Sequence, residues 1–266
     1  MAHLTLVTLH GKEAVIGPIV QGHGWTFSVV DAPTDQLGTF AGDVPRPAAP
    51  RETAAMKARL LELGPNWNAA SEGTVRDGGL LGPALDELVV ALRHSSPVIV
   101  GTAHAPLPCV RSVTLRHPMS LSEIEEQLTT TWPLPHSVMA TVNNVPVVRD
   151  VTMSHDVARR LAHELRETRE VRVFTDVRAH RCPERLAVIA SATHDLMDRL
   201  ITHCPRCDQP GFGAVADITG RPCELCCRPT AASVGHVMRC PWCDHHEEKR
   251  QNAGSIDPAF CEWCNP

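Results

Sequence analysis

The last quarter of the chain, Cys204 to Cys264, carries four Cys-x-x-Cys pairs: CPRC at 204–207, CELC at 223–226, CPWC at 240–243 and CEWC at 261–264. The segments between the pairs hold 15, 13 and 17 residues. Two thiolates two residues apart can bind one tetrahedral Zn²⁺ from a tight turn, and two such turns complete a four-cysteine site. The sequence therefore predicts two zinc ions in a module of residues 204–266, with these ligands: Cys204, Cys207, Cys223, Cys226, Cys240, Cys243, Cys261 and Cys264.

The residue after each pair supports the same interpretation. Asp208, Asp244 and Asn265 are of the types that tolerate the left-handed backbone such a turn often needs. Cys227 occupies the same position after the second pair, so we expect it not to be a ligand. Disulfides or a redox-active pair are the alternative. The sequence shows no signal peptide that would take the chain to an oxidising compartment, and we expect a cytoplasmic protein.

Which pair shares a metal with which is open, since sequential, interleaved and nested arrangements all leave closable gaps. The span Cys223–Cys243 resembles a self-contained ribbon, with a β-prone run at Ala232–Arg239 and a polar strand at His245–Arg250. This pattern favours nesting, in which the last pair folds back onto the first.

The charge of the module bears on its partners. From Cys204 to the end there are six Lys/Arg and eight Asp/Glu residues, so the basic footprint of a nucleic-acid-binding protein is missing. We expect a structural or protein-docking role. Phe212, Trp242, Phe260 and Trp263 would form a small core or, alternatively, an exposed docking patch.

The remaining 203 residues suit one sizeable α/β domain, with a mixed sheet flanked by helices. No apolar run approaches the length of a membrane span, so we expect no membrane partner. Cys109 and Cys182 lie outside the metal pairs and are expected to be buried free thiols.

The chain begins with a strand at Leu4–Thr8, a helix containing Pro18 and a second strand at Trp25–Val30. Ligands bind beyond the carboxyl ends of strands in such sheets. Thr8, His10, Gly11 and Lys12 would therefore form a phosphate cradle, in which Gly11 lets the backbone come close and Lys12 adds a positive charge. A plain connecting loop with a surface lysine is the alternative.

Three further segments contribute candidate ligands for a phosphate. The loop Asp31–Pro50 is expected to be a lid or binding loop, with a flexible linker as the alternative. A helix at Arg51–Leu63 places Lys57 near its middle, where it reaches the ligand or solvent. Ser71 and Glu72 would end a strand, and a carboxylate there can hold Mg²⁺ while phosphates supply further ligands; a solvated turn is the alternative.

The second half of the chain continues the α/β pattern, with a hairpin at Leu85–His104 whose Asp86 and Glu87 are second-choice metal carboxylates. A capping box, Ser120 to Glu123, opens a helix. Strands at 110–115, 138–142 and 171–175 and helices at 154–168 and 184–202 follow.

Asp176, Arg178 and His180 lie between a strand end and a helix start. Arg178 suits a phosphate or a base edge. His180 would act as an acid/base group, contact a ligand or only begin the helix. Because Lys12, Glu72 and Arg178 each follow an expected strand, we expect them to converge on one edge of the sheet, with Asp176 nearby.

The motifs Thr8-x-His10-Gly11-Lys12-Glu13, Gly38-Thr39-Phe40, Ala70–Gly73 and Asp176-x-Arg178-Ala179, together with the terminal cysteine segment, resemble an uncharacterised bacterial family described as a domain of unknown function. The resemblance extends over nearly the whole chain and implies no activity.

A more distant resemblance is to the inosine/xanthosine triphosphate pyrophosphatase superfamily. Thr8 and Lys12 match its first loop, Lys57 its basic helix, Glu72-Gly73 its acidic strand end and Arg178-Ala179 its late element. The asparagine expected in the first loop is missing, and a zinc module is not a usual part of that superfamily. The resemblance implies a nucleotide pyrophosphatase-like fold and a Mg²⁺-dependent site in which hydrolysis is kept, altered or lost.

Two functions follow. The first is a Mg²⁺-dependent nucleotide-phosphate hydrolase or binding protein, in which Lys12, Glu72 and Arg178 are catalytic and the other cradle residues bind the ligand. The second is a non-catalytic adaptor, in which the zinc module docks a protein partner. The two differ in whether Lys12, Glu72 and Arg178 meet in one pocket.

Overall fold

The computed structural model describes residues 2–9, 11–38, 44–77, 82–132, 136–152, 154–252 and 254–265. His10, Thr39, Phe40 and Asp43, which belong to motifs of the expected site, lie outside these residues. The chain forms two compact units: an N-terminal unit of Met1–Ser95 and Val100–Leu196, and a C-terminal unit of Ser96–Ile99 and Met197–Pro266. The division into domains at 203/204 stays a prediction about which segments fold independently.

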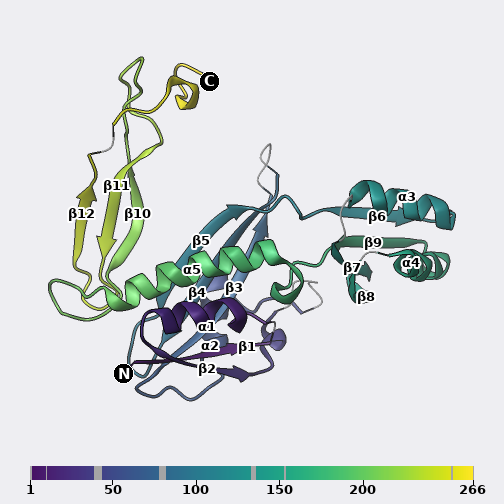
Figure 1. Cartoon of the computed structure of the whole chain (residues 1–266), viewed down its shortest axis with the longest axis horizontal. Coiled ribbons are helices and arrows are strands. Elements are labelled where there is room, and N and C mark those ends of the chain that lie inside the picture. Colours follow the sequence, from purple (N-terminus) through teal and green to yellow (C-terminus); the bar gives the residue numbers. More distant parts are fainter. Residues whose placement is uncertain are drawn as a thin grey trace. The chain divides into compact units, whose positions relative to one another are not determined.

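A five-stranded mixed sheet organises the first part of the N-terminal unit (Figure 1). Its strand order is β2-β1-β3-β4-β5, in which β1 pairs in parallel with β2 and β3, and β3 runs antiparallel to β4. The expected α/β class with a mixed sheet is therefore confirmed. The strands are β1 (His3–Thr8), β2 (Thr26–Asp31), β3 (Trp67–Arg76), β4 (Ala84–Leu92) and β5 (Ile99–Pro106).

Helices cover both faces of this sheet. Adjacent residues of a strand point to opposite faces. Glu72 of β3 contacts Lys57, whereas Glu87, which pairs with the next residue Gly73, contacts Arg185. The helices that carry Lys57 and Arg185 therefore lie on opposite faces. The helical segments around the sheet are α1 (Glu13–Gly22), η1 (Thr34–Leu37), α2 (Pro50–Ala58) and α5 (Pro183–Ile201).

A second, separate sheet differs from the single sheet expected. Its order is β6-β9-β7-β8, and all neighbouring strands are antiparallel. The strand before Asp176 is β9, so Asp176 and Arg178 follow a strand of this second sheet and not one of the first. The elements are β6 (Ser112–Arg116), α3 (Leu121–Thr131), β7 (Ser137–Val142), β8 (Val145–Thr152), α4 (His155–Thr168), β9 (Glu170–Thr175) and η3 (Ala179–Arg181).

One face of the second sheet is buried by helices. Val171 and Val173 of β9 pack in one apolar cluster with Ile124 and Leu128 of α3 and Leu161 of α4. The alternate residues Arg172 and Phe174 consequently point to the opposite face, away from these helices. This second face therefore does not pack against α3 or α4.

The C-terminal unit is built on a three-stranded antiparallel sheet of order β10-β11-β12. Two of these strands were expected, whereas β10 was not. The elements are β10 (Gly213–Thr219), β11 (Ser233–Arg239), β12 (His246–Arg250) and η4 (Pro258–Phe260).

The ends of the helices follow local signals. Ser120 accepts a hydrogen bond from the Glu123 amide while the Glu123 carboxylate accepts one from the Ser120 amide at 2.6 Å, so the capping box is confirmed. The helix expected at 51–63 ends earlier, at Ala58. Among the described residues, no helix combines the length and the apolar character that crossing a bilayer requires.

Candidate functional site

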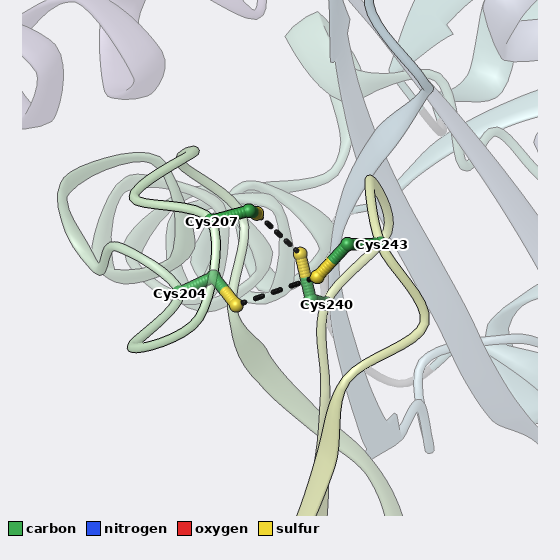
Figure 2. Close-up of side chains that lie close together, drawn as sticks. All are labelled: Cys204, Cys207, Cys240 and Cys243. Carbon is green, nitrogen blue, oxygen red and sulfur yellow. Dashed lines mark hydrogen bonds between the residues drawn. The ribbon is translucent and has the colours of Figure 1, made fainter.

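Two groups of four cysteines could each hold a metal ion. The first quartet consists of Cys204, Cys207, Cys240 and Cys243, and Figure 2 shows its four sulfur atoms turned toward one another. The Sγ atoms of Cys204 and Cys243 are 3.8 Å apart, and those of Cys207 and Cys240 are 3.6 Å apart. All four ligand atoms lie within 4.8 Å of one another.

The second quartet joins the second and fourth pairs. Cys223 lies 3.8 Å from Cys264, and Cys226 lies 3.7 Å from Cys261, measured between Sγ atoms. The arrangement is therefore interleaved, and the nested arrangement favoured by the sequence is wrong. Cys227 belongs to neither quartet and is exposed, as expected.

The strands explain why the quartets interleave. β10 and β11 have seven residues each, which corresponds to about 23 Å of extended chain. Each strand therefore carries the chain from one end of the sheet to the other. The first and third turns meet at one end, and the second and fourth meet at the other. In Figure 1 the C-terminus accordingly lies at the opposite end of this sheet from the end of α5.

The geometry of both quartets fits a tetrahedral ion. Four sulfurs at about 2.3 Å from a central zinc are about 3.8 Å from one another, whereas a disulfide requires about 2.05 Å. Asp208, Cys227 and Asp244, which follow three of the pairs, have φ values of 55°, 56° and 56°. The left-handed turn expected after the ligands is thus present at these three positions.

Backbone amides prepare one thiol of the second quartet for ionisation. The amide of Cys226 lowers the pKa of the Cys223 thiol to about 7, against the effect of burial and with help from the Leu225 amide. A metal ion binds the thiolate form, so this cysteine is poised to bind metal near neutral pH.

The aromatic residues of the C-terminal unit divide between the two quartets. Phe212 is buried and packs with Trp242 around the first quartet, where the Trp242 indole donates to Pro210 O at 2.7 Å. Phe260 and Trp263, beside the second quartet, are 79% and 57% exposed. The expected core role therefore holds for the first two residues and not for the last two.

A cationic cavity of about 50 Å³ lies in the N-terminal unit, beyond the end of β1. Among the residues that the structure describes, six cationic and two carboxylate side chains line it, so this described part of the wall carries a net formal charge of +4. The cations are Lys12, Arg46, Lys57, Arg149, Arg178 and Arg185, and the carboxylates are Asp35 and Glu72. Lys12, Glu72 and Arg178, which the sequence placed at one site, are thus brought together, with Thr8, Lys57 and Ser71 beside them.

Lys12 is a buried cation of this cavity for which the described residues provide no carboxylate partner. It is 9% exposed, and its Nζ donates to Ser71 O at 3.1 Å; within the described part of the chain it forms no ion pair. Burial, together with the Arg185 guanidinium, lowers the pKa of the Lys12 ammonium from 10.5 to about 8, and Glu87 and Glu72 offset only part of this. Ser71 Oγ is buried too and has no hydrogen-bond partner among the residues that the structure describes.

Glu72 holds two of the cations. Its Oε2 accepts from Lys57 Nζ at 2.7 Å, and its Oε1 lies 3.0 Å from Arg46 Nε. Arg46 also donates to Gly73 O at 2.7 Å and to Thr74 Oγ1 at 2.8 Å. Glu72 does not end a strand as expected, because β3 continues to Arg76 in its pairing with β4; it lies instead just past the end of the neighbouring β1.

Two buried ion pairs fix the other arginines. Arg178 donates from Nε and a terminal nitrogen to Asp176 at 3.0 and 2.7 Å, and Asp176 is 1% exposed. Arg185 Nε lies 3.0 Å from Glu87 Oε2 and also donates to Val177 O at 2.9 Å. Both guanidinium groups are therefore held in place before any ligand arrives.

Other predicted residues lie beside the cavity or away from it. Gly11, with φ +69°, comes close to His180, since a Cβ added to it would lie 3.3 Å from His180 Cβ; neither residue is in the described lining. Asp86 is half exposed and pairs with Arg76 and His104, which do not belong to the described lining of the cationic cavity.

Sequence reasoning missed Arg46, Arg149 and Arg185 as site residues. Arg46 lies in the loop 31–50 that the sequence indicated as a binding loop, so its position was a usable signal. Arg185 begins a helix and has no distinguishing local pattern.

The model of one protein family, described as a domain of unknown function (DUF6671), matches residues 136–266. A DUF6671 domain therefore spans β7 to the second quartet, including Arg178 and all four cysteine pairs, while Lys12 and Glu72 precede it. The expected resemblance to a family of unknown function is confirmed over this part of the chain. No curated protein and no solved structure matches the chain.

Proposed function

We propose that the cationic cavity binds the phosphate of a nucleotide or of another phosphorylated small molecule. The observation that carries this proposal is the positive charge of the cavity: its described wall carries +4, or +2 when the paired carboxylates Asp176 and Glu87 are counted, and its buried Lys12 has no carboxylate partner among the described residues. A charge excess of this kind is stabilised by an anion, and a phosphate accepts several charge-assisted hydrogen bonds at once. The unpaired Ser71 Oγ supplies a further donor.

The size of the cavity limits what it holds. A cavity of about 50 Å³ has room for the centres of only a few water molecules, about one for each 10–15 Å³. This suits one phosphate group, with the remainder of the ligand outside. Carboxylates and sulfates share this charge and similar size, so the phosphate assignment needs a direct comparison.

Magnesium is not a resident ion of this cavity in our proposal. Both oxygens of Glu72 already accept from Lys57 and Arg46, so a metal ion at Glu72 would have to displace one of these cations. Within the described lining, six of the eight charged side chains are cationic. Mg²⁺ would then enter as the partner of the ligand's phosphates.

Hydrolysis remains part of the proposal because of the resemblance to the pyrophosphatase superfamily. The parallel β1–β3 pair, with Lys12 beyond β1 and Lys57 on the covering helix, supports that fold and that site. The activity implied is the attack of water on a nucleoside triphosphate to give a monophosphate and pyrophosphate. Lys12, Lys57 and Arg178 would neutralise the charge that develops on the phosphoryl oxygens.

The test is binding and turnover by the full chain. Thermal unfolding and titration calorimetry with phosphate, pyrophosphate, sulfate, acetate and nucleoside triphosphates, with and without Mg²⁺, should show stabilisation by phosphates above the other anions. Lys12→Met should weaken this response, whereas Lys249→Met, an exposed lysine of the other unit, should keep it. The absence of a response to every phosphate in the wild-type protein would refute the proposal.

For the two cysteine quartets we propose zinc as the metal. Four thiolates at tetrahedral spacing suit zinc or iron, and zinc is the usual ion of closed structural sites made of four cysteines. Elemental analysis of the purified protein should give two zinc ions per chain. A content of one ion, or of iron in place of zinc, would overturn this assignment.

Docking of a protein partner by the C-terminal unit is the second candidate function. It is favoured by three large apolar side chains that are exposed beside the second quartet: Leu225, Phe260 and Trp263. Exposed aromatic residues of this kind are enriched where proteins meet. Trp263→Ala should lower the amount of any partner that co-purifies with the chain, while phosphate binding stays unchanged; equal recovery with both proteins would count against docking here.

A further inference from the structure

A second cavity, of about 320 Å³, lies over the face of the second sheet that points away from α3 and α4. We name it the sheet groove. Phe174 of β9 forms its floor with its two cross-strand neighbours, Ser112 of β6 and Met139 of β7. Thr141 and Arg172, which are paired one step further along, extend the same floor. The face opposite to α3 and α4 therefore has a lining of its own.

The sheet groove and the cationic cavity share a wall. Met139 lines both of them. The segment after β9 also lines both cavities: Val177 lines the sheet groove, and the next residue, Arg178, lines the cationic cavity. On β3, Ser71 lines the cationic cavity and Val75 the sheet groove. The two cavities are therefore immediate neighbours, and a ligand that passes Met139 would occupy both.

The distance between lining residues on β3 sets the length of a ligand that fills both cavities. Four residues of strand between Ser71 and Val75 correspond to about 13 Å. A phosphorylated acid of three or four carbons does not reach across this distance. A phosphate that carries a sugar and a ring does.

The lining of the sheet groove indicates the kind of group it holds. Its volume is that of an ordinary small-molecule site. Phe174 offers an aromatic face and Arg172 a guanidinium plane, and both stack on flat rings. Ser112, Thr141 and Asn144 offer hydroxyl and amide groups to polar ring edges. The described lining of the sheet groove is half apolar and half polar, a mixture that suits a heterocyclic base better than a fatty chain.

We propose that the sheet groove binds the nucleoside part of a nucleotide whose phosphate occupies the cationic cavity. This inference rests on the proposed function, because a phosphate bound in the cationic cavity positions the nucleotide so that its base reaches the second sheet. It narrows the ligand from any phosphorylated small molecule to a nucleotide. It also assigns a binding role to residues of β6, β7 and β9 that no sequence motif singled out.

The test compares ligands that share the phosphate but differ in the rest. Dissociation constants of pyrophosphate, ribose 5-phosphate and the four common ribonucleoside monophosphates are measured by calorimetry on the full chain. At least one nucleoside monophosphate should bind about tenfold or more tightly than ribose 5-phosphate, the gain expected from stacking of one base. Equal affinities of ribose 5-phosphate and all four nucleotides would overturn the assignment of the base.

A filling substitution locates the base. Ser112→Trp places a large ring in the sheet groove from an exposed position, and Arg116→Trp places the same ring on the same strand and face but outside the described lining. Ser112→Trp should remove the tenfold preference and leave pyrophosphate binding unchanged, and Arg116→Trp should preserve both. A preference that survives in Ser112→Trp would refute this site.

Failure of the proposed function gives a different result. If the wild-type chain binds neither pyrophosphate nor any nucleotide, the cationic cavity itself is wrongly assigned. If it binds pyrophosphate in a manner that depends on Lys12 but shows no preference for nucleotides, only the sheet groove is refuted.

Discussion

Replacing Lys12 by methionine distinguishes the effect of the buried ammonium on the stability of the fold from its effect on the affinity for the ligand. The two side chains have similar length, and Lys12 has one hydrogen bond, to Ser71 O. Lowering the pKa of this ammonium from 10.5 to about 8 corresponds to about 3 kcal/mol of lost stability when both folded and unfolded chains are protonated. Loss of the hydrogen bond to Ser71 O offsets about 1 kcal/mol of the stability that the variant gains. We therefore expect Lys12→Met to raise the free energy of unfolding by about 2 kcal/mol at neutral pH without ligand.

The pH dependence has a definite sign. Between about pH 8 and 10.5 the unfolded chain keeps the lysine proton while the folded chain has lost it. The contribution of Lys12 to stability therefore rises with pH across this window. In Lys12→Met the contribution is absent, so the difference in stability between variant and wild type should shrink as the pH is raised.

Ligand binding should depend on pH in the opposite direction. An anion needs the charged ammonium, so the dissociation constant should rise about tenfold for each pH unit above about 8. Sulfate is a suitable probe alongside phosphate, because its charge does not change in this range. Lys12→Met should bind more weakly and lose this pH dependence.

The assay is urea denaturation of both proteins at several pH values, with and without sulfate or phosphate. A variant that is less stable than the wild type at neutral pH would refute the account of the buried ammonium. Anion affinity that stays constant from neutral pH to about pH 10 would refute the role of its charge.

The remaining predictions concern the metal sites and the sheet. Cys207→Ser and Cys264→Ser should each reduce the metal content from two ions to one, and the double variant should bind none, whereas Cys227→Ser should keep both ions in elemental analysis. Retention of two ions by either single variant would contradict the quartets. Gly73→Ala would place a methyl group 2.2 Å from the carboxylate of a buried ion pair and should lower the free energy of unfolding by about 3 kcal/mol in denaturant titrations. The matched Gly64→Ala, which meets nothing within 4 Å, should change stability by less than about 1 kcal/mol, and similar losses for both would contradict the crowding.

Much of the fold could be predicted from periodicity and caps. The strand at His3–Thr8, the capped helix after Ser120 and the interior strand before Asp176 all follow such local signals. β10 was missed because only its first residue, Gly213, is buried, and the strand carries no alternation of apolar and polar residues. Without β10, the sequence lacked the strand that separates the first two cysteine turns, and the nested arrangement followed from that omission.

The candidate site was predictable where a motif follows a strand. Lys12 and Glu72 lie beside adjacent parallel strands, so sheet topology alone brings them together. Arg178 reaches the same cavity from a different sheet, which no local pattern indicates. Arg185 is held by an ion pair with Glu87, which lies 98 residues away in the chain, so only the tertiary structure reveals the position of Arg185.

The interleaved arrangement of the two quartets also has a consequence for metal binding while the chain is being synthesised. The ribosome releases the thiols in order, so the first quartet can close once Cys243 has emerged, whereas the second must wait for Cys264, 21 residues later. During that interval Cys223 and Cys226 lack their partner ligands Cys261 and Cys264. They could then bind an ion meant for the first quartet. Because β10 and β11 place these two cysteines at the other end of the sheet, we expect the hairpin to keep the nascent chain from binding metal in the wrong set of ligands.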